Sequence, residues 1–478
     1  MQPVLTVSEM RAVDEAAQQA VSISALVERA GTAVAVEALA MLGGAYGRRI
    51  VVVAGRGNNG NDGRVAGRLL ERRGGRVLLI DAADGVESTA GADLVIDAAY
   101  GTGYRGDYQA PDPAGAPVLA VDIPTGVAAD LGVASQGAVR ATRTVTFGAL
   151  KPGLLLNDGP GLVGEVEVRT IGLPVHERSV GMHLVGDDDL ALLPERKRSG
   201  HKWSVAVMVV AGSPGMYGAA GFVARAAGRS GAGMVRLGIP GAEARDLPVG
   251  SAVAMALPAE GFETAVLEEL ERFGALVIGP GLGTTPETAE AVRRLVASAK
   301  VPTVVDADGL TALGDVSQAA GVIGSRAGAP VILTPHDGEF ARMYGRPPGP
   351  DRVAEVRDLA ARVGAIVLLK GSTTVIASPD GAVLLAASGS PRLATAGSGD
   401  VLSGVIGAFV ARGVGCALAG AIAAHVHGVA ACSGRAEGLV AEDLPELVSD
   451  VLSRAVLVQA GLVGASDVGA RWEEASRG

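Results

Sequence analysis

The stretch TAGSGDVLSG, residues 395–404, places two glycines and one carboxylate at the start of an apolar helix. Glycines at a helix N-terminus leave backbone N–H groups bare, and such an end binds anions. Asp400 stands beside this anion site, where a bound phosphate would repel it. We therefore interpret Asp400 as a base that takes a hydroxyl proton as the oxygen attacks phosphorus. The alternative is that Asp400 only caps the helix.

Four further motifs follow apolar runs in the same half of the chain. GPGLG (279–283) allows a ligand to approach the backbone closely, and DADG (306–309) either holds Mg²⁺ or caps a helix. TPHDGE (334–339) lacks the H-E-x-x-H spacing of a zinc site. KGSTT (370–374) supplies a lysine and three hydroxyls without a Walker P-loop. Glycine turns, a lysine and hydroxyls together favour a phosphate-bearing ligand.

In the first half, GRGNNGND (55–62) follows one predicted strand and opens a helix. It matches G-x-G-x-x-G, and Asp81 ends the next strand as the ribose-binding acid of an NAD site would. The loop, however, contains three asparagines and an aspartate, whose oxygens suit a cation or a hydroxylated group better than a pyrophosphate. Asp97, Asp122 and Thr125 follow two neighbouring strands. The sequence thus predicts either a shared oxygen-rich site or separate helix caps.

The elements that position these residues alternate between strand-like and helix-like segments. Continuous β-branched runs such as RRIVVVAG (48–55) and ADLVIDAAYGTG (92–103) indicate parallel strands covered on both faces. The alternation stops in a charged stretch around 174–203 and restarts at SVAVMVVAG (204–212), and AIVLLKGSTTVIA (365–377) continues the second sheet. We therefore predict an α/β protein of two domains, with ligands at the carboxyl ends of the strands.

Composition limits the classes of function. The 478 residues are 48% hydrophobic and carry a net charge of −10, with acidic and basic residues mixed along the chain. This charge pattern argues against nucleic-acid or membrane-surface binding. The two cysteines and an N-terminus without an apolar core predict a cytoplasmic protein. The most apolar region, about 401–432, is interrupted too often for a membrane span, so we predict two core helices there.

Together these motifs resemble the bifunctional NAD(P)H-hydrate repair enzymes over roughly residues 3–455. The resemblance implies a Rossmann-like, three-layer α/β/α NAD(P)HX epimerase in residues 1–176 and a linker over 177–203. It further implies a ribokinase-like, ADP- or ATP-dependent (S)-NAD(P)HX dehydratase in residues 204–478. The motifs that carry the resemblance, in order, are SEMRAVD, GNNGND, DAAYGTG, DIPTG, TFGALKPG, HK, GSPGMYGAA, GAGMV, GPGLG, DADGL, TPHDGE, KGSTT and GSGDVLSG.

For the epimerase half the resemblance implies a substrate site and a K⁺ site. Asn59, Asp97 and Thr125 would coordinate K⁺. Asp122 is the candidate acid–base that assists loss of the ring hydroxyl and its return on the other face. The residues that would hold NADHX or NADPHX are Asn58, Asn59, Gly60, Asn61, Asp62, Gly101, Thr102, Gly103, Tyr104, Arg105, Gly106, Asp107 and Asp122.

For the dehydratase half the resemblance implies that Asp400 is the catalytic acid–base and that Mg²⁺ accompanies the nucleotide. The hydrated nicotinamide would contact Ala219, Gly281, Gly283, His336 and Asp400. The adenine nucleotide would contact Lys370, Gly371, Ser372, Thr373, Thr374 and Gly399. ADP would be converted to AMP and phosphate.

The chain departs from the family pattern at three positions. Asn61 and Trp203 replace residues that are often glycine, and Ser398 replaces a common threonine. We expect Asn61 to add bulk in the cation loop and Trp203 to narrow the second site. Ser398 keeps the hydroxyl and is expected to be harmless.

Three other functions stay open on the sequence. A sugar or vitamin kinase fused to a Rossmann domain explains the second half, and an NAD-dependent oxidoreductase explains only GRGNNG. A non-catalytic nucleotide-binding scaffold would turn nothing over. We expect small-molecule ligands only, and a homo-oligomer.

Overall fold

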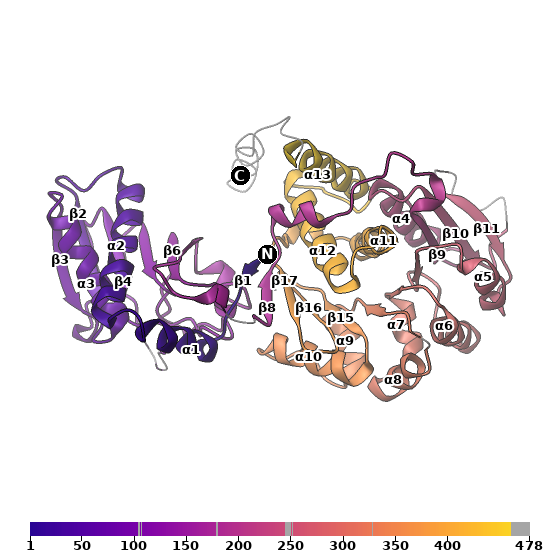
Figure 1. Ribbon diagram of the computed structural model, residues 1–478, viewed down its shortest axis with the longest axis horizontal. Helices are drawn as coiled ribbons and strands as arrows, with labels where there is room; N and C mark the ends of the chain where they lie inside the picture. Colours follow the sequence, from indigo (N-terminus) through magenta and orange to yellow (C-terminus); the bar gives the residue numbers. More distant parts are fainter. Residues whose placement is uncertain are drawn as a thin grey trace. The chain divides into compact units, whose positions relative to one another are not determined.

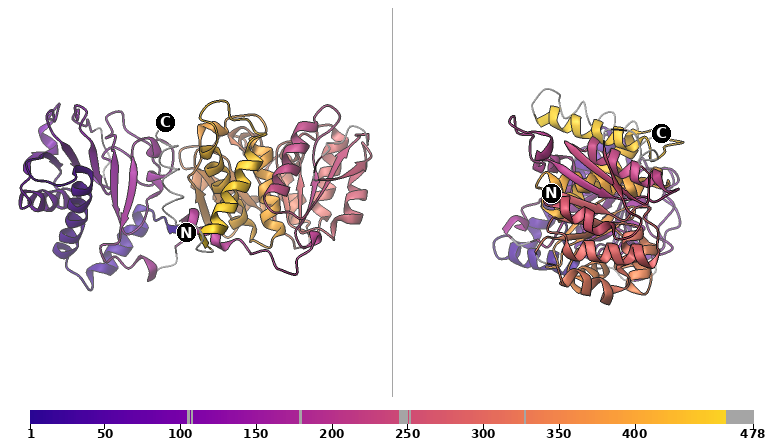
Figure 2. Two further views of the ribbon diagram at one scale, coloured as in Figure 1. Left: turned by 90° about the horizontal axis from the view of Figure 1, so that it is seen from above. Right: turned by 90° about the vertical axis from the view of Figure 1, so that its right-hand side faces the viewer.

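The computed structural model describes residues 1–103, 106, 108–177, 180–243, 250, 252–326 and 328–459 (Figure 1). The chain forms two compact units, one of Gln2–Met182 and one of His183–Gly478 with Met1 (Figure 2). The division between them falls inside the stretch 177–203, which separates the two alternating patterns in the sequence.

The N-terminal unit is built on a parallel sheet in the order β3-β2-β4-β5-β6-β7. The central strands are buried throughout, as the continuous β-branched runs predicted. The strands are β1 (Gln2–Pro3), outside this sheet, β2 (Arg49–Ala54), β3 (Arg76–Asp81), β4 (Leu94–Ala98), β5 (Val118–Val121), β6 (Arg143–Phe147) and β7 (Glu165–Arg169), and the helices are α1 (Val7–Gln18), α2 (Ile23–Leu42) and α3 (Asn58–Glu71).

The two faces of this sheet are covered differently. On one face, α1, α2 and α3 pack in a core with Ile50 and Val52. On the other face, Val51 and Val53 pack in a smaller core that includes Tyr108 from a connecting segment. Helix α3 begins directly after β2, so its first turn lies at the carboxyl edge of the sheet.

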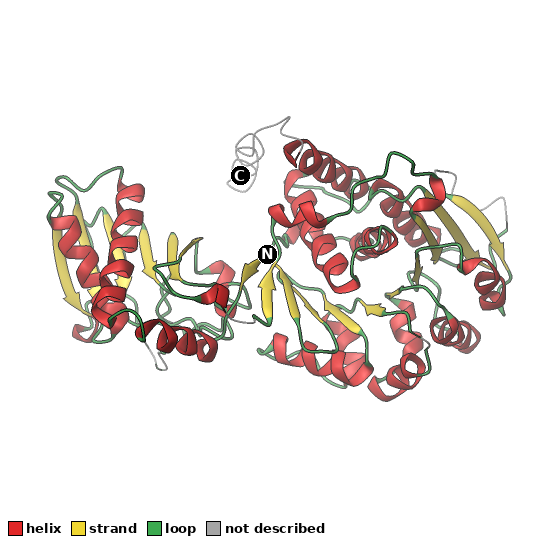
Figure 3. Cartoon of the chain, in the orientation of Figure 1, coloured by secondary structure: helices red, strands yellow, loops and turns green. Residues whose placement is uncertain are grey.

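The C-terminal unit has a sheet in the order β8-β17-β16-β15-β14-β13-β12-β9-β10-β11, with helices over both faces (Figure 3). Its strands are β8 (Met182–Leu184), β9 (Ala206–Val210), β10 (Met234–Pro240), β11 (Val253–Leu257), β12 (Ala275–Ile278), β13 (Thr303–Val305), β14 (Val331–Leu333), β15 (Ile366–Leu369), β16 (Thr374–Ala377) and β17 (Val383–Ala386). Its helices are α4 (Tyr217–Arg229), α5 (Phe262–Leu270), α6 (Pro286–Ser298), α7 (Asp308–Leu313), α8 (Val316–Gly324), α9 (Asp337–Tyr344), α10 (Arg352–Val363), α11 (Ser398–Ala411), α12 (Cys416–Ser433) and α13 (Leu444–Gln459).

Strands β9 to β15 pair in parallel, whereas β15, β16 and β17 pair antiparallel. The run 365–377 therefore continues the sheet as two strands, with KGSTT at the connection between them. The predicted pair of core helices is confirmed as α11 and α12. Among the described residues, α12 alone is long and apolar enough to cross a membrane, and it packs against β16 and β17.

Candidate active sites

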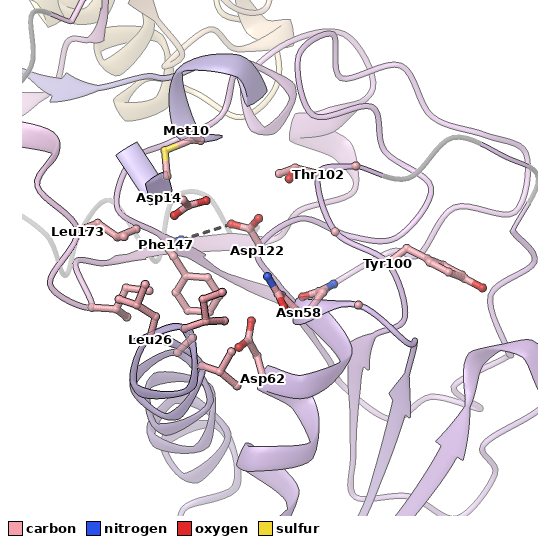
Figure 4. Close-up of a pocket in the computed structure, with 18 of the residues that line it drawn as sticks. Met10, Asp14, Leu26, Asn58, Asp62, Tyr100, Thr102, Asp122, Phe147 and Leu173 are labelled. Carbon is pink, nitrogen blue, oxygen red and sulfur yellow. Dashed lines mark hydrogen bonds between the residues drawn. The ribbon is translucent and has the colours of Figure 1, made fainter. Parts of the chain in front are cut away.

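A cavity of about 660 Å³ lies at the carboxyl edge of the N-terminal sheet (Figure 4). Its walls come from α1, α2, the first turn of α3 and the segments that follow β4, β5 and β6. The predicted substrate residues that line it are Asn58, Asn59, Asp62, Gly101, Thr102, Gly103 and Asp122. Tyr104, Arg105 and Asp107 lie outside the described residues.

Gly60, Asn61 and Gly106 are not among the residues that line this cavity. Gly60 is a packing residue, because a Cβ there would lie 1.9 Å from the carbonyl oxygen of Gly55. Asn61 is exposed on α3. The expectation that its side chain crowds the cation loop is therefore wrong, since the helix turns that side chain outward.

Asp122 is held at the cavity wall by Lys151, whose side chain is only 1% exposed. The ammonium Nζ donates to Asp122 Oδ1 at 2.5 Å, to Thr146 Oγ1 at 2.8 Å and to the Phe147 carbonyl at 3.0 Å. All three ammonium protons are thus used, and one of them binds Asp122 directly. Sequence reasoning missed Lys151, which lies in the motif TFGALKPG beyond the end of β6 at Phe147.

Two more carboxyl groups face the same cavity, Asp14 from α1 and Asp62 from α3 (Figure 4). Burial, and then the charge of Asp122, raises the pKa of Asp62 to about 8. The same two causes raise the pKa of Asp14, while Lys151 opposes them. The cavity therefore combines an ion-paired carboxylate with a carboxyl group that is protonated at neutral pH. Asp14 was also missed, because one aspartate on an amphipathic helix gives no local signal.

Asp97 and Thr125 form a buried pair beside this site. The Thr125 hydroxyl donates to Asp97 Oδ1 at 2.7 Å, and the Thr125 N–H donates to Oδ2 at 2.8 Å. Burial raises the pKa of Asp97 to about 6, against the hydrogen bonds from Thr125. Both amide atoms of Asn59 are buried without a partner among the described residues. An unpartnered buried amide is costly, so amide, carboxylate and hydroxyl here fit a cation that takes oxygen ligands.

In the C-terminal unit, Asp306 organises the residues around the N-terminus of α11. Its Oδ1 accepts from Lys370 Nζ at 2.6 Å and its Oδ2 accepts from the Ser403 hydroxyl at 2.6 Å. Gly399 lies against this lysine, since a Cβ there would be 3.1 Å from Nζ. Burial and the charge of Asp306 raise the pKa of Asp400 to about 7, although Lys370 lowers it. The structure thus brings Lys370, Gly399 and Asp400 together.

The DADG motif provides this anchor, and of its two predicted roles the helix cap is wrong, because α7 begins without a side-chain cap. Asp308 instead accepts from the Gly283 N–H at 2.9 Å. Of the other predicted residues, Gly281 lies beside Ala219, since a Cβ on Gly281 would lie 3.1 Å from the Ala219 Cβ. The Gly281 carbonyl accepts from the Ser213 hydroxyl at 2.9 Å.

His336 caps α9, where Nδ1 accepts from the Gly338 N–H at 2.9 Å and leaves Nε2 on an exposed side chain. Around the β15–β16 connection, Thr373 and Thr374 are buried, whereas Gly371 and Ser372 are exposed. The buried threonines therefore offer a ligand less access than the exposed pair does.

Comparison with known proteins covers both units. A family model described as NAD(P)H-hydrate dehydratase matches residues 207–454, and one described as YjeF-related protein N-terminus matches residues 23–85 and 80–153. The bifunctional NAD(P)H-hydrate repair enzyme of Moorella thermoacetica is 34% identical over 89% of this chain and 91% of its own. The enzyme of the same name from Mycobacterium tuberculosis is 38% identical over 87% of this chain and 90% of its own.

The chain belongs to the bifunctional NAD(P)H-hydrate repair enzyme family.

The C-terminal unit of this repair-family chain has the predicted ribokinase-like fold. A ribokinase-like protein from Enterococcus faecalis aligns with a TM-score of 0.50 and 21% identity, covering 57% of this chain and 96% of its own.

The two departures from the repair-family pattern in this unit lie at different places: Trp203 lies away from the reacting groups, and Ser398 begins α11 beside Gly399 and Asp400. Trp203 packs edge-on against Phe273 with Arg272 over its ring at 4.2 Å, beside the amino ends of β9 and β12. The expectation that Trp203 narrows the second site is therefore wrong, because Lys370 and the other predicted ligands follow the carboxyl ends. The Ser398 hydroxyl donates to the Leu393 carbonyl at 2.8 Å, which fixes the start of α11.

Proposed function

We propose that this protein repairs NADH and NADPH whose nicotinamide ring has been hydrated. The N-terminal unit interconverts the R and S hydrates, and the C-terminal unit dehydrates the S form with ADP, or ATP, as co-substrate. With ADP the products are AMP and phosphate. The observation that carries the proposal is that both units match the repair family and each has a carboxyl group at its strand ends.

In the dehydration, Asp400 takes the proton of the ring hydroxyl as the hydroxyl oxygen attacks the terminal phosphorus of the nucleotide. The bond from phosphorus to the leaving nucleotide oxygen breaks. Lys370, fixed by Asp306, and the N–H groups at the start of α11 stabilise the charge on the phosphoryl group. The ring nitrogen then expels phosphate, and loss of a proton from the adjacent ring carbon gives the dihydronicotinamide. Bound Mg²⁺ would neutralise phosphate charge.

In the epimerisation, the hydrated nicotinamide occupies the cavity beside Asp122. Asn59, Asp97 and Thr125 would hold K⁺, whose charge would fix the loops around the substrate. The unpartnered Asn59 amide and the Asp97–Thr125 pair support this cation site. Replacing K⁺ by choline should slow the conversion of R to S hydrate in the absence of ADP. An unchanged rate would remove the cation from the proposal.

The proposed function is tested with a mixture of R and S hydrates, ADP, Mg²⁺ and K⁺. The wild-type protein should restore the near-ultraviolet absorbance of the reduced nicotinamide for both epimers. Asp400→Asn should lose dehydration by about 10²-fold or more, because a positioned acid–base contributes that factor. A stable phosphorylated product would instead indicate a small-molecule kinase, and no reaction with ADP or ATP would refute the repair function.

A further inference from the structure

Epimerisation at the hydrated carbon needs two proton-handling groups. One must protonate the hydroxyl on the face from which it leaves, and the other must accept a proton from water that adds to the opposite face. The N-terminal cavity has carboxyl groups on different walls. Asp62 rises from the first turns of α3 beside Leu26, whereas Asp122 and Asp14 lie across the cavity from it (Figure 4).

The surroundings of Asp62 and Asp122 differ, because only Asp122 pairs with Lys151. Asp62 is 7% exposed and lies among apolar groups from α2, including Leu26 and Ala30. Among the described residues that line the cavity, Lys151 carries the positive charge. Its three ammonium protons are donated to Asp122, Thr146 and the Phe147 carbonyl, so none is directed to Asp62.

The remaining charged groups around the cavity do not neutralise Asp62. Across the cavity, Asp122 after β5 raises the pKa of Asp62 further, and Asp14 on α1 is a carboxyl group whose own pKa is raised. Arg64 on α3 donates to the Gly55 carbonyl at 2.7 Å. A desolvated carboxyl group that faces another carboxyl group favours its protonated form, whereas Asp122 has Lys151 as an ion-pair partner at 2.5 Å.

Resting on the proposed epimerase function, we infer that Asp62 is a catalytic residue that donates the proton which expels the ring hydroxyl, with Asp122 as the base on the opposite face. The Asp62 proton moves to the hydroxyl oxygen, the carbon–oxygen bond breaks, and water leaves with the bonding pair. The ring nitrogen lone pair forms the N=C bond of an iminium ion. Water adds to the other face, the N=C pair returns to nitrogen, and Asp122 takes the proton of the adding water. Exchange with cavity water restores both groups, and the opposite conversion reverses these steps.

The test uses the full chain without ADP, so that no dehydration takes place. Conversion of purified R hydrate to S hydrate is measured by chromatography. Asp62→Asn keeps the size and polarity of the side chain but supplies no acid. We expect kcat to fall about 100-fold with KM changed by less than about threefold. Asp62→Glu should restore part of the rate. Glu71→Gln, on an exposed part of the same helix, is the matched control and should behave as wild type.

The wild-type epimerisation rate should fall as pH rises through about 8, because the acid form of Asp62 is then lost. The Asn variant should lack this limb. Each variant is checked for folding of the N-terminal unit by circular dichroism and thermal unfolding of the full chain, because dehydration of the S hydrate reports only on the C-terminal unit. If Asp62→Asn epimerises within about threefold of wild type, or raises only KM, the acid role is overturned. If wild type does not epimerise at all, the proposed function of the N-terminal unit fails.

Discussion

At the residue scale, the buried ammonium of Lys151 is the cation that pairs with Asp122 at the wall of the epimerase cavity. Lys151→Met should lower the free energy of unfolding by about 3 kcal/mol, because Asp122 and two buried acceptors lose their shared donor. It should also slow epimerisation, since the base loses its orientation. Chemical denaturation and the epimer assay measure both effects. Lys300→Met, which breaks the exposed pair with Glu271, is the control and should leave stability nearly unchanged.

A second prediction at the residue scale concerns Asp400 and the pH dependence of dehydration. Burial raises its pKa to about 7, so the base form is populated only above that pH. The kcat/KM of dehydration should therefore fall as pH drops below about 7. A raised pKa also means that the contribution of Asp400 to stability is present at low pH and is lost as pH rises through about 7. Asp400→Asn should thus lose dehydration but be more resistant to heat than wild type at pH 8. A pH-independent kcat/KM would contradict the assignment.

Some of these site residues could be predicted from the sequence, and others could not. Asp122 was found because it follows an apolar run, and Asp400 because it precedes one with glycines beside it. Asp306 was marked, but its partner Ser403 was not, since 97 positions separate the two hydrogen-bonded groups. Lys151 was missed for a related reason. Ion pairs of this kind form only when the sheet brings distant strand ends together, and local composition carries no trace of that distance.

At the element scale, the fit of α11 against α4 depends on Gly404. A Cβ there would lie 2.3 Å from the Val223 carbonyl oxygen and 2.9 Å from Ala226 Cβ. Gly404→Ala should therefore destabilise the protein by about 2–3 kcal/mol, because backbone must move to admit the methyl group. Gly321→Ala, inside α8 with open space around the site, is the matched substitution and should stabilise by about 0.5–1 kcal/mol. Equal effects in thermal unfolding would show that helix propensity, not packing, governs both positions.

The elements were predictable to different degrees. The buried parallel strands were found because both faces are covered, which leaves unbroken runs of Val and Ile. Strand β7, with the sequence EVEVR, was not predicted, because it is an edge strand of alternating pattern with partly exposed side chains. The antiparallel β16 and β17 were also not anticipated as such. Whether two strands pair in parallel or antiparallel depends on how the chain connects them, and side-chain composition does not indicate that connection.

At the scale of the whole molecule, the two sites draw their residues from different compact units. The epimerase cavity is lined by residues of Gln2–Met182, and the groups around Asp400 come from His183–Gly478. Each site has its own sheet and its own hydrophobic core. A substitution that acts through short-range charge or hydrogen bonding in one unit should therefore leave the chemistry of the other unchanged.

This independence is tested with an equal mixture of R and S hydrates. Asp400→Asn should equilibrate the epimers at the wild-type rate but yield no NADH, because only the dehydratase base is lost. Lys151→Met should convert the S hydrate to NADH at the wild-type rate and then consume the R hydrate only at its slowed rate of epimerisation. Mixing the two variants should restore complete recovery, since the S hydrate released by one can be consumed by the other. If Lys151→Met also slows dehydration of pure S hydrate while the protein stays folded, the two units are energetically coupled and the sites do not work independently.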